Sequence, residues 1–347
     1  MQSSLILDEF DRRLIAALQL NGRAQWKDIA KALGSSESTV VRRGRHLCDS
    51  GVVRVIGFVD TLRCGLGVPV LTRMTCPPAF RERLSAEVRA HRQVRYATTL
   101  AGSADIVAEF VVGAHRNLAR LLSSDLPGAD VVTSTETLTV MRTFHSTRAW
   151  EENLLAPESV TLLRPEGGDP TVERYWREPL ALDDVDLAIL AALGENGRKT
   201  VKQLAQEAGT SESTAARRLE RLVSEGCVYF RTVIHPALLG FATEILIWLS
   251  VDSGALEDVA QQLVGHPSVK FVWVTTGRLN ICAGAHLRHN SELYAFEADV
   301  LGSLKGVRVS EITPHVTTLK RAWIDLLEGG IPSRPDHVAE AVRGLAQ

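Results

Sequence analysis

The 347-residue sequence lacks the features of a membrane or secreted protein. No apolar run approaches the roughly 18 residues that a membrane-spanning helix needs, and residues 1–11 lack the basic and then apolar layout of a signal peptide. The five cysteines are odd in number and scattered, without a C-x-x-C pair, which argues against a disulfide framework or a structural zinc site. We therefore expect a cytoplasmic protein with no membrane partner, no metal site and no cofactor.

The chain also lacks an excess of charge of one sign. Its 39 basic and 41 acidic residues leave a net charge of −2, which excludes a polycation but leaves room for a local basic face that binds nucleic acid. The hydrophobic fraction of 45% is that of an ordinary globular protein. Length alone suggests roughly two to four domains.

The sequence repeats itself at an offset of 175 residues. The Asn-Gly-Arg motif at 21–23 recurs at 196–198, the Ser-Glu-Ser-Thr motif at 36–39 recurs at 211–214, and the Arg-Arg pair at 42–43 recurs at 217–218. The register extends to Gly102 and Gly277 and to Glu136 and Glu311, with no gap. Such a match indicates two copies of one unit.

The first part of each copy has the pattern of three short helices and a strand. Asp8 is a suitable N-cap for a first helix, in which apolar residues follow at helical spacing. A second helix is expected at about 26–33, and Gly34 and Ser35 make a turn before Ser36 caps a third helix that runs to about Ser50. Residues 52–59 are strand-like and are expected to form the wing of a winged helix-turn-helix module.

The second part of each copy has the order strand-helix-strand-strand-helix-strand. Strands are expected near 68–75, 94–100, 105–112 and 131–142, with helices near 79–90 and 115–125; in the second copy the strands fall near 244–251, 269–275, 280–286 and 306–314, with helices near 256–264 and 291–301. This order predicts a ferredoxin-like layer with helices on one sheet face. The other face needs a partner, so we expect sheets to pack together.

The predicted fold class is therefore α+β, a tandem repeat of a winged helix-turn-helix domain and a ferredoxin-like βαββαβ domain. The expected boundaries are a first winged module at 1–60, a first ferredoxin-like domain at 61–147, a Pro- and Gly-rich linker at 148–181, a second winged module at 182–235, a second ferredoxin-like domain at 236–328, and a tail at 329–347 with one short helix near 336–345.

Both third helices are local basic islands. Residues 38–54 hold four arginines against one acidic residue, and residues 213–231 hold four arginines against two. A recognition helix needs hydroxyls and amides for phosphate at its start and arginines that reach base edges. The residues expected to contact DNA are Ser36, Ser38, Thr39, Arg42, Arg43, Arg45 and Arg54, and in the second copy Ser211, Ser213, Thr214, Arg217, Arg218, Arg221 and Arg231. The competing interpretation is a solvated surface whose arginines pair with carboxylates, or a protein-interaction module.

These motifs together resemble the leucine-responsive regulator/AsnC family, the feast-or-famine transcription regulators. The resemblance rests on the Leu-Asp starts at 7–8 and 182–183, the repeated motifs above, the glycines at 51 and 226, and the Gly-Ser-Ala-Asp segment at 102–105. Family members usually carry one such unit, so this chain resembles two units fused. The resemblance implies a regulator with double-stranded DNA as partner and an RAM-type effector domain that binds an amino acid or a related metabolite. It also implies homo-oligomers formed through the ferredoxin-like domains.

The loop between the second and third ferredoxin-like strands is the expected effector site. In the first copy its residues are Gly102, Ser103, Ala104 and Asp105, and in the second copy Gly277, Arg278 and Asn280. A glycine lets backbone amides approach a carboxylate, and an aspartate can receive an ammonium group. The alternative is a tight turn whose Gly and Asp serve only the turn. Asn280 lacks the charge of Asp105, so we expect the second copy either to have no such pocket or to bind a different ligand there.

Two departures from the family pattern carry expectations. Gly44 takes an inward position where the second copy has Leu219, so we expect a propensity cost of about 1 kcal/mol, to which any void left unfilled would add. We therefore expect the third helix to be locally soft and to become ordered on DNA. Glu220 replaces the equivalent of Arg45. We therefore expect Arg42→Ala or Arg43→Ala to weaken DNA binding more than Arg217→Ala.

An enzyme is the alternative from another class. The two-part architecture is also similar to that of siroheme decarboxylases. The resemblance implies that a histidine- and tyrosine-rich strand would bind the macrocycle. The corresponding stretches here, 94–99 and 269–274, contain no histidine. A metal pair at His286 and His289 lacks an evident third ligand, and no catalytic grouping is apparent. We therefore expect a DNA-binding regulator rather than an enzyme.

Overall fold

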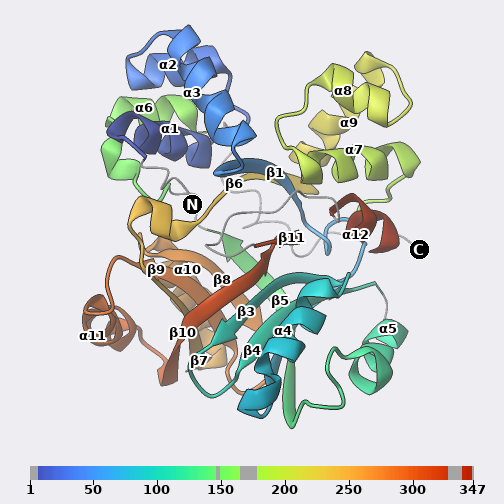
Figure 1. Ribbon diagram of the computed structural model, residues 1–347, viewed down its shortest axis with the longest axis vertical. Helices are drawn as coiled ribbons and strands as arrows, with labels where there is room; N and C mark the ends of the chain where they lie inside the picture. Colours follow the sequence, from blue (N-terminus) through green and yellow to red (C-terminus); the bar gives the residue numbers. More distant parts are fainter. Residues whose placement is uncertain (1–6, 114, 146–148, 165–177, 327–337, 346–347) are drawn as a thin grey trace.

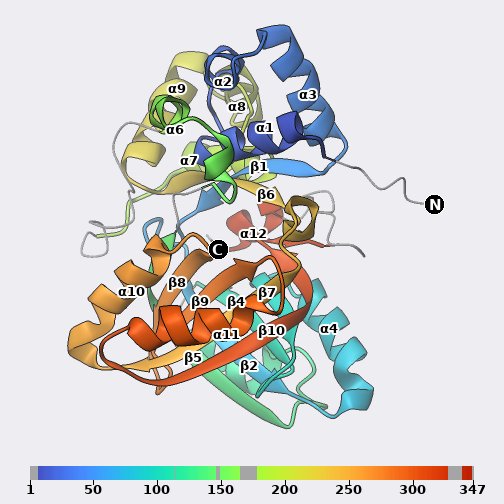
Figure 2. The same ribbon diagram turned by 90° about the vertical axis from the view of Figure 1, so that its left-hand side faces the viewer.

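The computed structural model describes residues 7–113, 115–145, 149–164, 178–326 and 338–345. They form two layers (Figure 1). Helices of both helix-turn-helix modules make one layer, and the strands of both ferredoxin-like domains make the other. Figure 2, turned by 90°, shows that α3 and α9 lie on opposite flanks of the helical layer, away from the strands.

Three helices build each helix-turn-helix module. They are α1 (Glu9–Leu20), α2 (Trp26–Leu33) and α3 (Glu37–Asp49) in the first copy, and α7 (Asp184–Glu195), α8 (Val201–Glu207) and α9 (Glu212–Ser224) in the second. The predicted caps are confirmed: Asp8 accepts a hydrogen bond from the Asp11 amide, and Ser36 accepts one from the Thr39 amide. Gly34 ends α2 in the left-handed region at φ 63°, which a residue with a Cβ enters only with strain.

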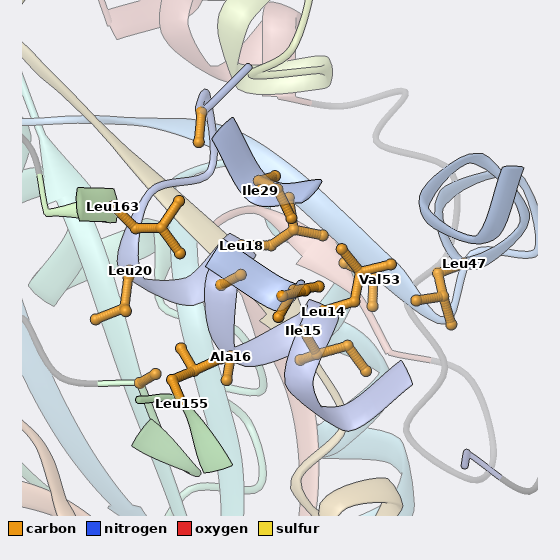
Figure 3. Close-up of a cluster of buried hydrophobic side chains, with 14 of the residues drawn as sticks. Leu14, Ile15, Ala16, Leu18, Leu20, Ile29, Leu47, Val53, Leu155 and Leu163 are labelled. Atoms are coloured by element: carbon orange, nitrogen blue, oxygen red, sulfur yellow. The ribbon is translucent and has the colours of Figure 1, made fainter. Parts of the chain in front are cut away.

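Residues 149–164 belong to the core of the first module, which corrects the linker expected at 148–181. The core is formed by α1, α2 and α3 around Leu14, Leu18 and Ile29 (Figure 3). η3 (Glu152–Leu154) and α6 (Pro157–Leu163) bring Leu155 and Leu163 into the same cluster. These apolar side chains explain why the segment folds onto the module instead of crossing solvent. Residues 165–177 of the expected linker lie outside the described residues.

The two modules share one ribbon, which corrects the expectation of a wing in each. β1 (Val53–Val59) follows α3, β6 (Val228–Ile234) follows α9, and the two strands pair antiparallel with each other in a two-stranded sheet. Each strand satisfies its backbone groups across the repeat because its own module supplies no second strand. The repeated Asn-Gly-Arg motif strengthens this junction reciprocally. Arg23 Nη1 donates to the Gly197 carbonyl, and Arg198 Nη1 donates to the Gly22 carbonyl, each at 2.5 Å.

Eight long strands close into a ring. They are β2 (Val68–Thr75), β3 (Val94–Leu100), β4 (Ile106–Val112) and β5 (Ser134–His145), and then β7 (Thr243–Val251), β8 (Val269–Thr275), β9 (Ile281–Leu287) and β10 (Val307–Arg321). Within each copy the order is that of a ferredoxin-like sheet. β5 also pairs with β8, and β10 pairs with both β7 and β3. The two sheets therefore form one barrel in which each long last strand crosses into the other copy.

The sheet faces that were expected to join two chains are covered within one chain. Leu71, Val107 and Leu246, with Trp248 and Trp273, are buried between the two sheets. The outer faces are covered by helices of their own copy: η1 (Pro78–Phe80), α4 (Arg81–Ala90), α5 (His115–Arg120) and η2 (Leu121–Asp125) in the first, and η5 (Ser253–Ala255), α10 (Leu256–Gly265), α11 (Glu292–Ala295), η6 (Phe296–Val300) and η7 (Leu301–Ser303) in the second. The duplication thus supplies the partner sheet that a single unit would take from a second chain.

Three short elements complete the fold. η4 (Pro236–Leu239) follows β6, β11 (Ile324–Asp325) pairs with the end of β10, and α12 (Val338–Leu345) packs against α7. Val342 of α12 is buried in the core of the second helix-turn-helix module. The expected tail helix is therefore part of that module. No helix within the described ranges is long and apolar enough to cross a membrane.

Gly44 leaves no void, because Trp26 fills the space that the sequence suggested was empty. A Cβ on Gly44 would lie 2.6 Å from the Trp26 ring, and the guanidinium of Arg198 stacks on the same ring at 3.9 Å. In the second copy the equivalent pair is Val201 and Leu219. One copy thus combines a large residue with a glycine, and the other combines two residues of intermediate size.

This exchange of volumes predicts the outcome of a double-mutant cycle. Gly44→Leu should destabilise the protein by about 1–3 kcal/mol through overpacking against Trp26. Adding Trp26→Val, which recreates the pair of the second copy, should recover part of that loss. Urea denaturation of the two single variants and the double variant measures the coupling. Strictly additive effects would contradict the packing described.

Candidate nucleic-acid interface and interlayer cavity

The outward face of α3 presents two exposed arginines. Arg42 and Arg45 form no ion pair within the described part of the chain, and both line a shallow open hollow together with Ser38 and His46. On α9 the equivalent exposed arginine is Arg217, while Glu220 takes the position of Arg45. The outward charge is therefore greater on the first helix, as the sequence predicted.

The second arginine of each Arg-Arg pair fastens the third helix to the first. Arg43 pairs with Asp8 and Asp11, the capping-box residues of α1. Arg218 pairs in the same way with Asp183 and Asp186. Asp186 is fully buried, and Arg221 also contacts it at 3.4 Å. These contacts agree with the competing interpretation, in which arginines pair with carboxylates, for Arg43, Arg218 and Arg221.

Arg231 faces the strands rather than the outer face of α9, which contradicts its assignment to DNA. It lies on β6 and lines a cavity between the ribbon and the barrel, with its guanidinium 5.2 Å from the centre of the Tyr229 ring. Arg54 lies on β1, where alternate residues face the same side of the ribbon. It therefore shares a face with Ile56 and Phe58, which line the same cavity. Arg231 faces inward because β1 and β6 pair across the modules instead of forming wings, whereas the guanidinium of Arg54 lies near Gly51 at the end of α3.

The hydroxyl groups at the start of each third helix form a small exposed cluster. Ser36 Oγ lies 3.1 Å from Ser38 Oγ and donates to Thr39 Oγ1 at 2.9 Å. The second copy repeats the arrangement with Ser211, Ser213 and Thr214. A helix N-terminus with free amides and hydroxyls suits a phosphate group. This placement is compatible with the backbone contacts predicted from the sequence.

The aspartate of the expected effector loop is occupied by its own domain. Asp105 is buried, its Oδ2 accepts a hydrogen bond from the Cys76 amide at 2.8 Å, and its Oδ1 pairs with Arg81. Asn280 does the same at the equivalent place, because its Oδ1 accepts from the Val251 amide at 2.8 Å and its Nδ2 donates to the Val251 carbonyl. Both residues join the loop to the end of a neighbouring strand. The contacts support the turn interpretation that the sequence left open.

The glycines of these loops permit a close approach of the other copy. A Cβ on Gly102 would lie 2.5 Å from Thr313 of β10, and a Cβ on Gly277 would lie 2.5 Å from Leu138 of β5. Of the remaining loop residues, Ala104 is buried, Arg278 is exposed, and Ser103 bonds to Arg73 and Glu311. An effector role for these loops remains a prediction, and their contacts assign them to the closure of the barrel.

A cavity of about 220 Å³ lies between the ribbon and one end of the barrel. Its walls combine aromatic side chains with charged ones from both ribbon strands and seven barrel strands. They are Phe58, Tyr229 and Arg231 from the ribbon, and Arg95, Tyr96, Glu109, His145, Glu244, Lys270, Phe271, Trp273, His286, His315 and Arg321 from the barrel. Most of these residues carry no local signal in the sequence, because they lie far apart along the chain.

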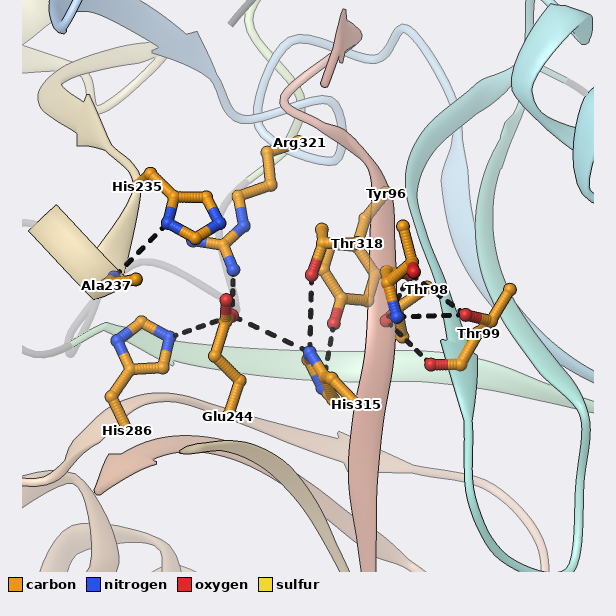
Figure 4. A network of polar contacts seen from close by, with 11 residues as sticks. Tyr96, Thr98, Thr99, His235, Ala237, Glu244, His286, His315, Thr318 and Arg321 are labelled. Atoms are coloured by element: carbon orange, nitrogen blue, oxygen red, sulfur yellow. Dashed lines mark hydrogen bonds and ion pairs between the residues drawn. The ribbon is translucent and has the colours of Figure 1, made fainter. Parts of the chain in front are cut away.

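A carboxylate network occupies one wall of the cavity (Figure 4). Glu244 Oε2 pairs with Arg321 and lies 3.4 Å from His286 Nε2 and 3.6 Å from His315 Nδ1. Burial opposes ionisation of Glu244, but Arg321 and the two histidines outweigh it and hold its pKa well below the usual range. Burial lowers the pKa of His286 to about 4, against the effect of Glu244. The network therefore contains an ionised carboxylate beside a neutral His286.

The low pKa of His286 predicts an acid-sensitive fold. Between pH 6.5 and 4 the unfolded state binds a proton at this histidine that the folded state does not, so stability falls as pH decreases through this window. The loss should approach about 2 kcal/mol between pH 6.5 and 5. Urea denaturation at pH 7 and pH 5 measures it, and His286→Gln should reduce the difference. Replacing the exposed His46 by Gln is the control; an equal reduction there would refute the assignment.

The neighbouring strands β3 and β4 hold a buried ion pair. Arg95 of β3 donates to Glu109 of β4 through Nε at 2.8 Å and through Nη2, and both side chains are at most 6% exposed. Burial alone would lower the pKa of Arg95, but Glu109 outweighs it and raises that pKa. The pair is charge-balanced and bidentate, which is the geometry that a buried arginine requires.

His286 and His289, the pair considered for a metal, lie in different surroundings. His286 is buried against Glu244, whereas His289 lies exposed beyond the end of β9. No group of three or more potential metal ligands is present among the residues that the structure describes.

Comparisons with known sequences cover both halves of the chain. Residues 7–47 and 182–223 match the family model of the AsnC-type helix-turn-helix domain, and residues 70–150 and 244–322 match that of the Lrp/AsnC ligand binding domain. The chain is 32% identical over 127 residues to the HTH-type transcriptional regulator FL11 of Pyrococcus furiosus, covering 36% of this chain and 83% of that protein. It is 29% identical over 140 residues to the HTH-type transcriptional regulator Ptr1 of Methanocaldococcus jannaschii, covering 40% and 95%.

A solved structure matches the chain over its full length. The siroheme decarboxylase NirDL superposes with a TM-score of 0.61 and 14% identity, covering 98% of this chain and 100% of that one. At this level of identity, the structural similarity shows a shared fold and nothing more. The tandem arrangement of two helix-turn-helix modules over two joined ferredoxin-like sheets therefore exists in a second protein.

Proposed function

The chain belongs to the Lrp/AsnC family of transcription regulators as a tandem fusion of two units, and we propose that it binds DNA sequence-specifically through α3 and α9. The exposed arginines of α3 carry this proposal. Arg42 and Arg45 project from a helix that Arg43 fastens to α1, with hydroxyl groups at its N-terminus. Charged donors on a firmly held helix are what base and phosphate contacts require.

The fusion places two DNA-binding modules in one chain. The ribbon of β1 and β6 and the reciprocal contacts of Arg23 and Arg198 hold the two modules side by side. One chain thus offers two recognition helices, which a single-unit regulator obtains by dimerisation. We propose cytoplasmic action on double-stranded DNA and modulation by a small metabolite. Further self-association would use surfaces outside the barrel, because the inner sheet faces are buried against each other.

Selection of genomic DNA fragments by the purified full chain tests this function. We expect recovery of a common sequence that the chain binds in a gel shift at least about 1,000-fold more tightly than unrelated DNA. Affinity should fall steeply as salt rises from 50 to 200 mM, since phosphate contacts release counterions. Binding without any sequence preference, or no binding at low salt, would refute a sequence-specific regulator.

The enzyme alternative is favoured by one observation, the presence of histidines in the cavity. Residues 94–99 and 269–274 contain no histidine, but three other strands do. His145 of β5, His286 of β9 and His315 of β10 line the cavity. All three are engaged, His145 with Tyr229 and the other two with Glu244. A titration with siroheme followed in the Soret region separates the candidates. We expect no saturable spectral shift for a regulator.

A further inference from the structure

The duplication provides an internal comparison for the cavity. The residue equivalent to Arg95 in the second copy is Lys270, and the residue equivalent to Glu109 is Gly284. The register agrees: Tyr96 lies opposite Glu109, and Phe271 lies opposite Gly284, with a bulge just before each pair. The bulge re-aims Arg95 and Lys270 in the same way. The two copies thus place a cation at the same point, and one copy lacks the carboxylate.

The missing carboxylate leaves the ammonium of Lys270 without an anionic partner within the described residues. Its Nζ donates to the Pro267 carbonyl at 2.6 Å and lies 5.5 Å from the centre of the Trp150 ring. Phe271 covers Gly284, where a Cβ would lie 2.3 Å from its ring. Burial lowers the pKa of Lys270 to about 7. A cation without a carboxylate partner can be stabilised by an anion that enters the cavity.

Other polar groups in the cavity cannot supply the missing charge. Glu109 is bound to Arg95, and Glu244 is bound to Arg321. Asp60 lies near Arg63, whose amide donates to it at 2.9 Å, and burial raises the pKa of Asp60. The charge balance of these groups therefore leaves Lys270 in excess, and the cavity favours an anion.

The remaining wall of the cavity near Lys270 is aromatic. The rings of Phe271 and Trp273 lie 4.2 Å apart between centres, and Tyr96 meets both edge-on at 6.2 and 5.7 Å. Such a surface binds planar apolar groups through stacking and edge contacts. A cavity of about 220 Å³ fits a compact molecule of one or two rings.

We propose that this cavity binds a small aromatic carboxylic acid, whose carboxylate pairs with the Lys270 ammonium while its ring lies against Tyr96, Phe271 and Trp273. The site is distinct from the Gly-x-x-Asp loops, whose polar groups are used in closing the barrel.

The position of the cavity gives the ligand a route to the recognition helices. Its roof is the ribbon, and β1 begins four residues after the end of α3, as β6 does after α9. A ligand that changes the packing between ribbon and barrel would shift the two helices relative to each other. This regulatory role rests on the proposed function; the binding itself does not.

Calorimetric titration of the full chain in the absence of DNA tests the site. Phenylacetate is the probe, phenylacetamide is its uncharged control, and a change in tryptophan fluorescence that is lost in Trp273→Phe is a second readout. We expect phenylacetate to bind at least tenfold more tightly than the amide. Lys270→Met should abolish this preference with little effect on the amide, and Lys305→Met, at an exposed lysine, should preserve it.

The outcomes separate this inference from the proposed function. Equal binding of acid and amide, no binding of phenylacetate at millimolar concentration, or a preference that survives Lys270→Met would each overturn the site. Thermal denaturation guards against misfolding, since removal of a half-buried cation that has no carboxylate partner should not lower the melting temperature. A DNA-binding protein that fails these titrations would still be a regulator, with its effector bound elsewhere.

Discussion

Replacing Arg42 by alanine is expected to weaken specific DNA binding by about 5- to 150-fold, the range for one arginine contact to a base edge. Arg42 is exposed on the outward face of α3 and is not used to stabilise the module. Arg45→Ala should have an effect of similar size, and the double variant should lose both contributions. Fluorescence anisotropy with a labelled operator fragment at fixed salt measures these losses.

The structure changes the ranking that the sequence suggested for the Arg-Arg pair. Arg43 is paired with Asp8 and Asp11, so Arg43→Ala should lower thermal stability and affect DNA only by loosening α3. Arg217→Ala should weaken binding less than Arg42→Ala, since Glu220 stands beside it on α9. Arg92, an exposed arginine of the barrel layer, is the matched control. Equal losses for Arg42→Ala and Arg92→Ala would show that only overall charge matters.

Glu109→Gln is expected to destabilise the fold by about 3–5 kcal/mol, the largest effect on stability that we predict. Glu109 and Arg95 are both buried, and the guanidinium lies against Phe58 at 4.8 Å and Trp323 at 5.5 Å. Loss of the carboxylate charge leaves that cation buried without a partner. Chemical denaturation at neutral pH gives the change in free energy of unfolding.

Two comparisons make this prediction specific. Asp130→Asn breaks the exposed contact with Arg83 and should cost less than about 1 kcal/mol. The double variant Arg95→Met with Glu109→Leu should recover most of the loss, because apolar replacement of both partners removes the unpaired charge. A double variant as unstable as Glu109→Gln would show that shape, and not charge, sets the cost.

The repeat made much of the secondary structure readable. Local signals such as the Asp8 and Ser36 caps, the turn at Gly34 and the alternation of apolar residues depend on neighbours within a few positions, and the structure confirms them. The second copy repeats these signals and so supports the same assignment of helices and strands. The two copies also differ at a position that matters for the cavity, because Arg95 and Glu109 are replaced by Lys270 and Gly284. This exchange is visible in the sequence, but its consequence depends on which residues face each other in the sheet.

Pairing between distant segments could not be predicted in this way. Strands 53–59 and 228–234 looked like two wings, because a strand pattern does not say which partner it takes. Gly44 suggested a void, because the ring of Trp26 that fills it comes from another helix. The aspartate of the effector loop looked available until its contacts with Cys76 and Arg81 were known.

The amino-acid sequence by itself determined the units: two helix-turn-helix modules, two ferredoxin-like domains, their family, and the basic character of both third helices. These follow from short-range periodicity, capping and charge, which act along the chain. Only the tertiary structure decided how the units are used. It joined the two strands into one ribbon, closed the sheets into one barrel and turned Arg231 inward, and it left Lys270 facing a cavity without a counter-charge. Those outcomes depend on contacts between residues up to 200 or more positions apart, whose geometry no local pattern encodes.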